Sequence, residues 1–68
     1  MSKFYFSDDI IKVLRRKGFD FISQKGSHMK FQNANLLLTV IIPASRKEIP
    51  IGTFRSILRQ SKLKLEDF

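Results

Sequence analysis

The stretch GFDFISQKGSHMKFQ, which covers Gly18–Gln32, decides how this chain folds. Apolar and polar residues alternate in it on both sides of the pair Lys25–Gly26. The residues of one alternating apolar set are Phe19, Phe21, Met29 and Phe31. A period of two is typical of strands with one covered face, and glycine between two such runs indicates a turn. The stretch therefore predicts two antiparallel strands joined by a tight turn.

An amphipathic helix is predicted directly before this hairpin, over Ser7–Lys17. Ser7 is expected to cap its first turn, and Asp8 and Asp9 follow near the positive end of the helix dipole. Gly18 stands where a left-handed residue commonly ends a helix. The apolar stripe consists of Ile10, Ile11, Val13 and Leu14, and the last turn carries Arg15, Arg16 and Lys17.

A third strand is predicted after the hairpin. The segment Asn33–Asn35 contains two residues that tolerate a positive φ, and we expect it to form the second hairpin tip. The run Leu36–Ile42 is apolar on both faces, which is typical of a central strand or of a strand covered by a partner. Pro43 ends this strand, and a basic loop, Ala44–Glu48, follows.

The segment IPIGTFRSILRQ, residues 49–60, predicts a second helix. Pro50 is expected in or near its first turn, where the missing N–H costs nothing. The apolar side of this helix consists of Phe54, Ile57 and Leu58. Three apolar residues after it, Leu63, Leu65 and Phe68, are expected to form a short docked tail.

The order of elements predicts one α+β domain over residues 1–68, with the pattern αβββα. We expect a three-stranded antiparallel sheet with two helices packed on one face, which leaves the other face open. Because apolar side chains take the covered side, Met29 and Phe31 should face the helices. His28, Lys30 and Gln32 should then point to the open side. The imidazole is therefore expected to be accessible to solvent and to lie beside a cation.

Composition narrows the classes of function. The 68 residues carry 13 Lys and Arg against 6 Asp and Glu, a net charge of +7, whose counterparts are nucleic acid, an acidic protein or an anionic membrane. We favour nucleic acid. Cysteine is absent and histidine occurs once, which excludes disulfides and a zinc site built from these residues. The apolar run 36–42 is too short to span a bilayer, so a cytoplasmic setting without membrane contact is expected.

His28 suits the cleavage of RNA without a metal cofactor. A base removes the proton of the ribose 2′-hydroxyl, this oxygen attacks the adjacent phosphate, and an acid protonates the departing 5′-oxygen. Histidine, with a reference pKa of about 6.5, populates both forms near neutral pH. The cations available to stabilise the charged phosphate are Lys25, Lys30, Arg46 and Lys47, while Ser27 and the backbone amide of Gly26 are candidates for gripping it.

Two alternatives stay open for this residue. His28 can equally be an ordinary surface histidine. If it is catalytic, the second proton transfer falls to a lysine, to Tyr5 or to water, and this predicts a slow nuclease. Serine hydrolase chemistry is disfavoured because Ser27 and His28 are neighbours whose side chains point to opposite faces. The chain also lacks the HExxH, Walker and GxGxxG motifs.

The chain resembles the HicA family, the mRNA-interferase toxins of HicA–HicB toxin–antitoxin pairs. The resemblance rests on IIKVLRRKGFDFISQKGSHMKF, residues 10–31, and on IPIGTFRSILRQSKL, residues 49–63. It implies a fold like the double-stranded RNA-binding domain and ribosome-independent cleavage of RNA with His28 as the catalytic group. It also implies a HicB-type antitoxin that covers the active surface and forms a hetero-oligomer with the toxin.

The sequence departs from the family pattern at two places. Lys62 stands where the family usually has glycine after the second helix. The loop after the third strand, residues 43–47, lacks the histidine that is common there, which removes a second acid–base group from the loop.

Other features of the sequence leave the function open. A non-catalytic RNA-binding module of the same fold would explain the charge equally well, and an adaptor for an acidic protein is a weaker alternative. Arg55 and Arg59, four residues apart on a helix, form either a ridge for RNA phosphates or a solvated face. Leu37 and Ile41 would share the open face with His28, as a site for antitoxin or self-association.

Overall fold

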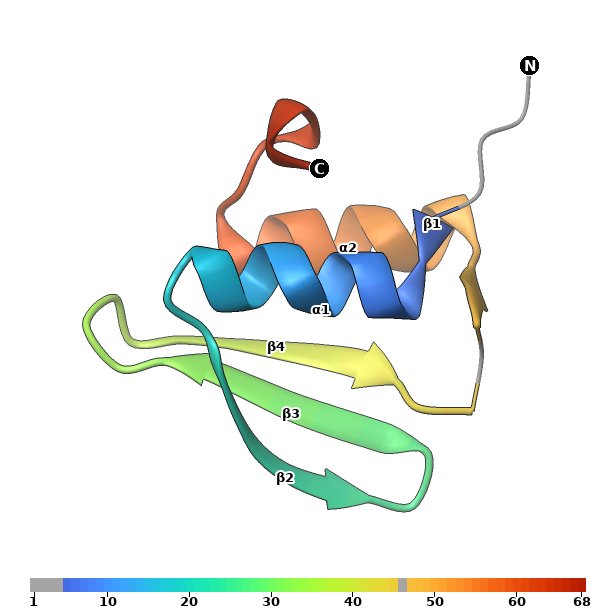
Figure 1. The fold of residues 1–68 in the computed structure, drawn as a ribbon, viewed down its shortest axis with the longest axis horizontal. Coiled ribbons are helices and arrows are strands. Elements are labelled where there is room, and N and C mark those ends of the chain that lie inside the picture. The colour runs from blue at the N-terminus through green and yellow to red at the C-terminus, as the bar shows by residue number, and fades with distance from the viewer. Residues whose placement is uncertain (1–4, 46) are drawn as a thin grey trace.

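The computed structural model describes residues 5–45 and 47–68 and consists of two layers, with helices on one side of a sheet (Figure 1). The elements are β1 (Tyr5–Phe6), α1 (Ser7–Arg16), β2 (Asp20–Lys25), β3 (His28–Asn33), β4 (Leu38–Pro43), β5 (Glu48–Ile49), α2 (Ile51–Ser61) and the short 3-10 helix η1 (Leu65–Asp67). The antiparallel sheet has the order β2-β3-β4. The predicted α+β class and the αβββα core are confirmed.

The end of α1 turns the chain directly into the sheet. Gly18 has a φ of 91°, and its N–H donates to the carbonyl of Arg15 at 3.1 Å. The next N–H, that of Phe19, donates to the carbonyl of Leu14 at 2.9 Å. This pair of bonds is the Schellman arrangement, which a glycine adopts without steric cost. The predicted left-handed cap is confirmed, and it places the ring of Phe19 in the core.

The beginning of α1 differs from the prediction. The N-cap residue is Phe6, and Ser7 is the first helical residue, without a capping hydrogen bond from its side chain. The Ser7 N–H instead donates to the backbone carbonyl of Lys47 at 2.8 Å. The prediction of a serine cap was wrong because the helix begins one residue earlier than expected, so Ser7 lies in its first turn and Phe6 takes the N-cap position.

The register of the sheet confirms which side chains share a face. Phe31 pairs with Phe21 on one side and with Val40 on the other, and Met29 pairs with Ile42. Directly opposite residues of an antiparallel pair lie on the same face. This set faces the helices, as predicted. Ile22 is the extra residue of an irregularity between Phe21 and Ser23, and it is half exposed.

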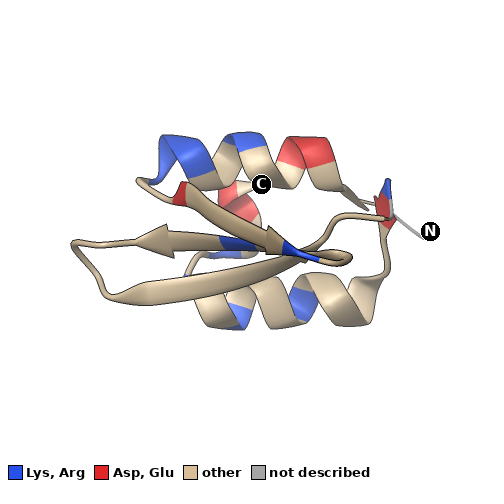
Figure 2. Cartoon of the chain, turned by 90° about the horizontal axis from the view of Figure 1, so that it is seen from below, with Lys and Arg blue, Asp and Glu red and all other residues tan. Residues whose placement is uncertain are grey.

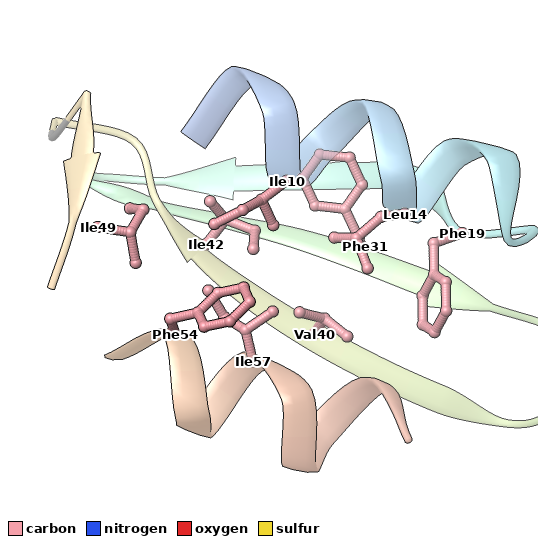
Figure 3. Close-up of a cluster of buried hydrophobic side chains, with 9 residues drawn as sticks. All are labelled: Ile10, Leu14, Phe19, Phe31, Val40, Ile42, Ile49, Phe54 and Ile57. Atoms are coloured by element: carbon pink, nitrogen blue, oxygen red, sulfur yellow. The ribbon is translucent and has the colours of Figure 1, made fainter. Parts of the chain in front are cut away.

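The core lies between this sheet face and both helices (Figure 3). Its buried residues are Ile10, Leu14, Phe19, Phe31, Val40, Ile42, Ile49, Phe54 and Ile57. They come from α1, the segment before β2, the covered face of β3 and β4, β5 and α2, so one apolar cluster joins both layers. Burial of each such side chain contributes roughly 1.5–3 kcal/mol before the loss of chain entropy. The opposite face of the sheet stays uncovered.

The third strand is shorter than predicted and lies at the edge of the sheet. β4 begins at Leu38, because residues 34–37 form the turn that was expected at 33–35. Leu37 adopts the positive φ, at 56°, and not an asparagine. Of the two alternatives for this strand, the central position is excluded because β3 is central. The apolar face formed by Leu38, Val40 and Ile42 is covered by the helices, as expected.

Two short strands were not predicted from the sequence. Tyr5 of β1 pairs with Ile49 of β5, and Phe6 pairs with Glu48. Glu48 was expected at the end of a loop and Ile49 at the beginning of the second helix. This pair holds the beginning of α1 next to the beginning of α2 (Figure 1). The helix α2 agrees with the prediction, with Pro50 as its N-cap residue.

The C-terminal tail docks in part, as expected. The ring of Phe68 meets that of Phe54 edge to face, with centroids 5.1 Å apart, while Tyr5 stacks on Phe54 at 3.9 Å. Leu63 is half buried, but Leu65 is 58% exposed, so its predicted docking was wrong. Within residues 5–45 and 47–68, neither helix has the length and apolar character needed to cross a membrane.

Candidate active site on the open sheet face

Three rows of side chains cross the open face of the sheet. They are the rows Lys25–His28–Pro43, Ser23–Lys30–Ile41 and Asp20–Gln32–Thr39. His28 begins the central strand and is exposed, as the alternation predicted. Lys30 and Gln32 are exposed as well and follow along the same strand. The imidazole therefore projects from an uncovered surface and is accessible to a large ligand.

Two lysines flank the imidazole. Lys25 is the direct partner of His28 across the hairpin, and such partners have Cα atoms about 4.5–5.5 Å apart. Lys30 lies two residues along the same strand, a rise of roughly 7 Å. Both lysines lie on the same face of the sheet as the imidazole. A phosphate group beside His28 would lie within reach of both ammonium groups.

The turn that carries this site has a defined conformation. Lys25 and His28 close a two-residue connection, Gly26–Ser27, in which Gly26 has a φ of 59°. A positive φ at the first of two turn residues is typical of a type II′ hairpin and suits glycine. A side chain at Gly26 would meet no atom within 4 Å, so this glycine is required by its backbone angle and not by crowding.

Two hydrogen bonds hold the tip of the hairpin. The Gln24 side chain donates through Nε2 to the carbonyl of Gly26 at 3.1 Å. The backbone N–H of Ala44 donates to the carbonyl of Ser27 at 2.6 Å. The first bond links the turn to its own strand, and the second links it to the segment after β4. Together they restrict the position of the residue that follows, His28.

Sequence reasoning missed four residues that shape this face. Gln24 and Ala44 gave no signal, because their bonds depend on the folded arrangement. Pro43 completes the row of His28 at the edge of the sheet, where proline is tolerated because it lacks an N–H. The sequence could therefore have predicted that Pro43 lies on an edge strand. Gln60 of α2 accepts a hydrogen bond through Oε1 from the N–H of Ile41 at 3.0 Å and so covers part of the β4 edge.

The other predicted residues do not belong to the hairpin. Lys47 is exposed and lies next to the beginning of α1, where its carbonyl accepts the Ser7 N–H. Tyr5, named as a possible proton donor, is stacked on Phe54 in the helical layer. Arg46 lies outside the described residues. The hairpin thus brings together Lys25, Gly26, Ser27, His28 and Lys30.

A comparison with protein families identifies the chain. A family model described as the HicA toxin of bacterial toxin–antitoxin systems matches residues 7–63, which run from the beginning of α1 to just past α2. The chain belongs to the HicA toxin family. It is thus a toxin of a toxin–antitoxin system. No curated protein matches the chain. The matched region contains both segments on which the resemblance was based.

Proposed function

We propose that this HicA-family toxin is a metal-independent endoribonuclease that cleaves mRNA, with His28 as its acid–base group. The observation that supports this most strongly is the exposure of His28 on the uncovered sheet face, directly opposite Lys25. Cleavage of mRNA would explain how a member of this toxin family acts as a toxin.

The proposed reaction is a transesterification within the RNA backbone. His28 removes the proton from a ribose 2′-hydroxyl, and this oxygen bonds to the adjacent phosphorus. The bond from phosphorus to the 5′-oxygen breaks, and that oxygen takes a proton from water or a lysine ammonium. The products are a 2′,3′-cyclic phosphate and a free 5′-hydroxyl. Lys25 and Lys30 balance the charge that accumulates on the phosphate oxygens.

The residues of the turn are proposed to bind the same phosphate. The Gly26 N–H and the Ser27 hydroxyl lie next to His28 in sequence and at the hairpin tip. Lys47 and Arg46 follow β4, and we assign them to more distant phosphates of the RNA strand. Single-stranded RNA is the expected substrate because cleavage in line with the leaving oxygen requires a flexible backbone.

The partner is proposed to be a HicB-type antitoxin that covers the open face in the cytoplasm. The half-buried side chain of Ile41 lies in the row of Lys30 and gives this basic face an apolar spot. A protein bound there would prevent RNA from reaching His28.

The test is cleavage of unstructured RNA by purified toxin and by the His28→Ala variant. A single acid–base group contributes about 10²–10⁴ in rate, so we expect the variant to lose at least about a hundredfold. Gln32→Ala, an exposed change on the same face, is the matched control and should retain activity. A deoxyribose at the cut site should block cleavage, and EDTA should not. Full activity of His28→Ala would exclude the mechanism.

A non-catalytic RNA-binding module of the same fold is the second candidate. It is favoured by the single histidine in the sequence, which leaves one of the two proton transfers without an imidazole. This candidate predicts RNA that is bound but not cut. Its binding constant should fall with salt, with a logarithmic slope near −0.7 per phosphate contact on single strands.

A further inference from the structure

We propose that a groove along α1 binds an acidic segment of the antitoxin that carries an apolar anchor. This inference rests on the proposed function only in naming the antitoxin as the partner. The groove has a volume of about 790 Å³ and runs from β1 to the C-terminal Phe68. It belongs to the helical layer, whereas His28 projects from the opposite, uncovered side of the sheet. The antitoxin would thus hold the toxin by a second surface.

The floor and walls of the groove are apolar. Phe6, the N-cap residue of α1, is 48% exposed. Tyr5 and Phe68 are half buried against Phe54 and leave their outer surfaces to the groove. An aromatic surface of this kind, left uncovered beside charged residues, is typical of a site where a partner inserts an apolar side chain.

The rim of the groove is charged in an ordered way. Asp9, Lys12 and Arg16 also line it, and their spacing of three and four residues places them on one face of α1. Figure 2 shows the acidic residues at the beginning of α1 and the basic residues toward its end. An occupant that complements this rim carries its carboxylates toward Lys12 and Arg16. The same occupant keeps its carboxylates away from Asp9. The charges of the rim therefore determine the direction in which the occupant binds.

The same features favour a protein segment over RNA. Every nucleotide carries a phosphate, so an RNA strand along the whole groove would bring one beside the Asp9 carboxylate. A peptide can place acidic residues at one end only. The apolar lining, which includes Phe6, Ile10 and Val13, also offers more to an aliphatic or aromatic side chain than to a ribose.

The first experiment maps the contact directly. Phe6 is replaced by the photo-reactive residue p-benzoylphenylalanine in the toxin, with the His28→Ala change to prevent RNA cleavage. This toxin is purified with the antitoxin encoded beside it, with RNA added, and irradiated. We expect a crosslink from position 6 to the antitoxin. A crosslink to RNA, to a second toxin or within the toxin chain, or no crosslink at all, would overturn the proposal.

The second experiment separates the groove from the general field of the molecule. The double variant Lys12→Glu, Arg16→Glu is compared with Arg55→Glu, Arg59→Glu on α2, which changes the same charges at the same spacing on exposed residues. Calorimetry should show affinity for the antitoxin falling about tenfold or more for the α1 pair and less than about threefold for the α2 pair. Equal losses would mean that net charge alone attracts the partner, and the groove proposal would fail.

Failure of this proposal and failure of the proposed function give different results. Both experiments measure binding and are carried out with toxin that also has the His28→Ala change, so they do not depend on whether the wild-type protein cleaves RNA. A toxin that binds through the groove but never cuts RNA would contradict only the endoribonuclease proposal. A toxin that cuts RNA but shows no contact at position 6 would contradict only the groove.

Discussion

Lys62 illustrates the effect of a single backbone angle. This residue follows α2 with a φ of 61°, in the left-handed region where a side chain crowds its own carbonyl. The left-handed conformation costs a residue other than glycine about 1–2 kcal/mol. Replacing Lys62 by glycine removes this cost. Glycine also loses more chain entropy on folding, about 0.5–1 kcal/mol, so only part of the cost is recovered as stability. The position is nevertheless one where glycine fits better than lysine.

We expect Lys62→Gly to raise the free energy of unfolding by about 0.5–1 kcal/mol. For a chain of this size, this corresponds to an increase in Tm of about 2–8 °C, measured by thermal denaturation followed by circular dichroism. Lys62→Ala is the control, because it removes the same charge but keeps the Cβ atom. An equal gain in both variants would show that the charge, and not the backbone angle, destabilises this site.

At the scale of elements, Asn33 joins the end of α1 to the turn between β3 and β4. Its side chain is buried, and its Nδ2 donates to the carbonyl of Lys17 at 3.1 Å. Its Oδ1 accepts from the N–H of Leu36 at 3.0 Å. A Cβ atom at Gly18 would come within 3.0 Å of the same amide. One side chain therefore connects a helix end, a strand and a turn.

Asn33→Ala is expected to lower the free energy of unfolding by about 1–3 kcal/mol, because it removes two part-buried hydrogen bonds that contribute about 0.5–1.5 kcal/mol each. Urea denaturation measures this loss. Asn35→Ala, an exposed change in the neighbouring turn, is the matched control and should stay within about 0.5 kcal/mol of the wild type. If both variants lose the same small amount, Asn33 serves only as a turn residue, as its sequence context suggested.

For the molecule as a whole, the parts predicted from the sequence are those fixed by local patterns. Alternation around Lys25–Gly26 identified the hairpin, the open face and the exposure of His28, since strand geometry alone determines them. Lys25 and Lys30 were found for the same reason, as neighbours within one hairpin. Gly18 was found because a left-handed helix end has a strong residue preference.

The parts that were missed depend on contacts between distant segments. The pairing of β1 with β5 joins residues more than forty positions apart through strands too short to show a period. The predicted serine cap was wrong because the helix begins one residue earlier, where Phe6 pairs with Glu48 and the Ser7 N–H donates to the Lys47 carbonyl. The hydrogen bond from the Ala44 N–H to the Ser27 carbonyl likewise joins segments that are distant in the sequence. Lys47 could not be assigned to a layer without these contacts.

The C-terminal tail closes the molecule, and its contribution to stability should depend on pH. Asp67 accepts a hydrogen bond through Oδ2 from the Lys64 N–H at 2.8 Å, and its Oδ1 lies 3.5 Å from Nζ of Lys17. The backbone hydrogen bond, followed by the charge of Lys17, lowers the pKa of Asp67. A carboxyl whose pKa is lower in the folded state stabilises the fold above its ordinary pKa, about 3.9, and ceases to do so as the pH falls through the lowered value.

We therefore expect Asp67→Asn to lower Tm at pH 7 and the difference from the wild type to shrink as the pH falls below about 4. Thermal denaturation from pH 7 to pH 2 measures this. Lys17→Ala is the informative comparison: it removes the ion pair but keeps the stronger backbone bond, so it should retain most of the acid dependence that Asp67→Asn abolishes. A difference in Tm that stays constant down to pH 2 would mean that Asp67 acts through shape alone, and that the tail is held by the ring of Phe68 on Phe54.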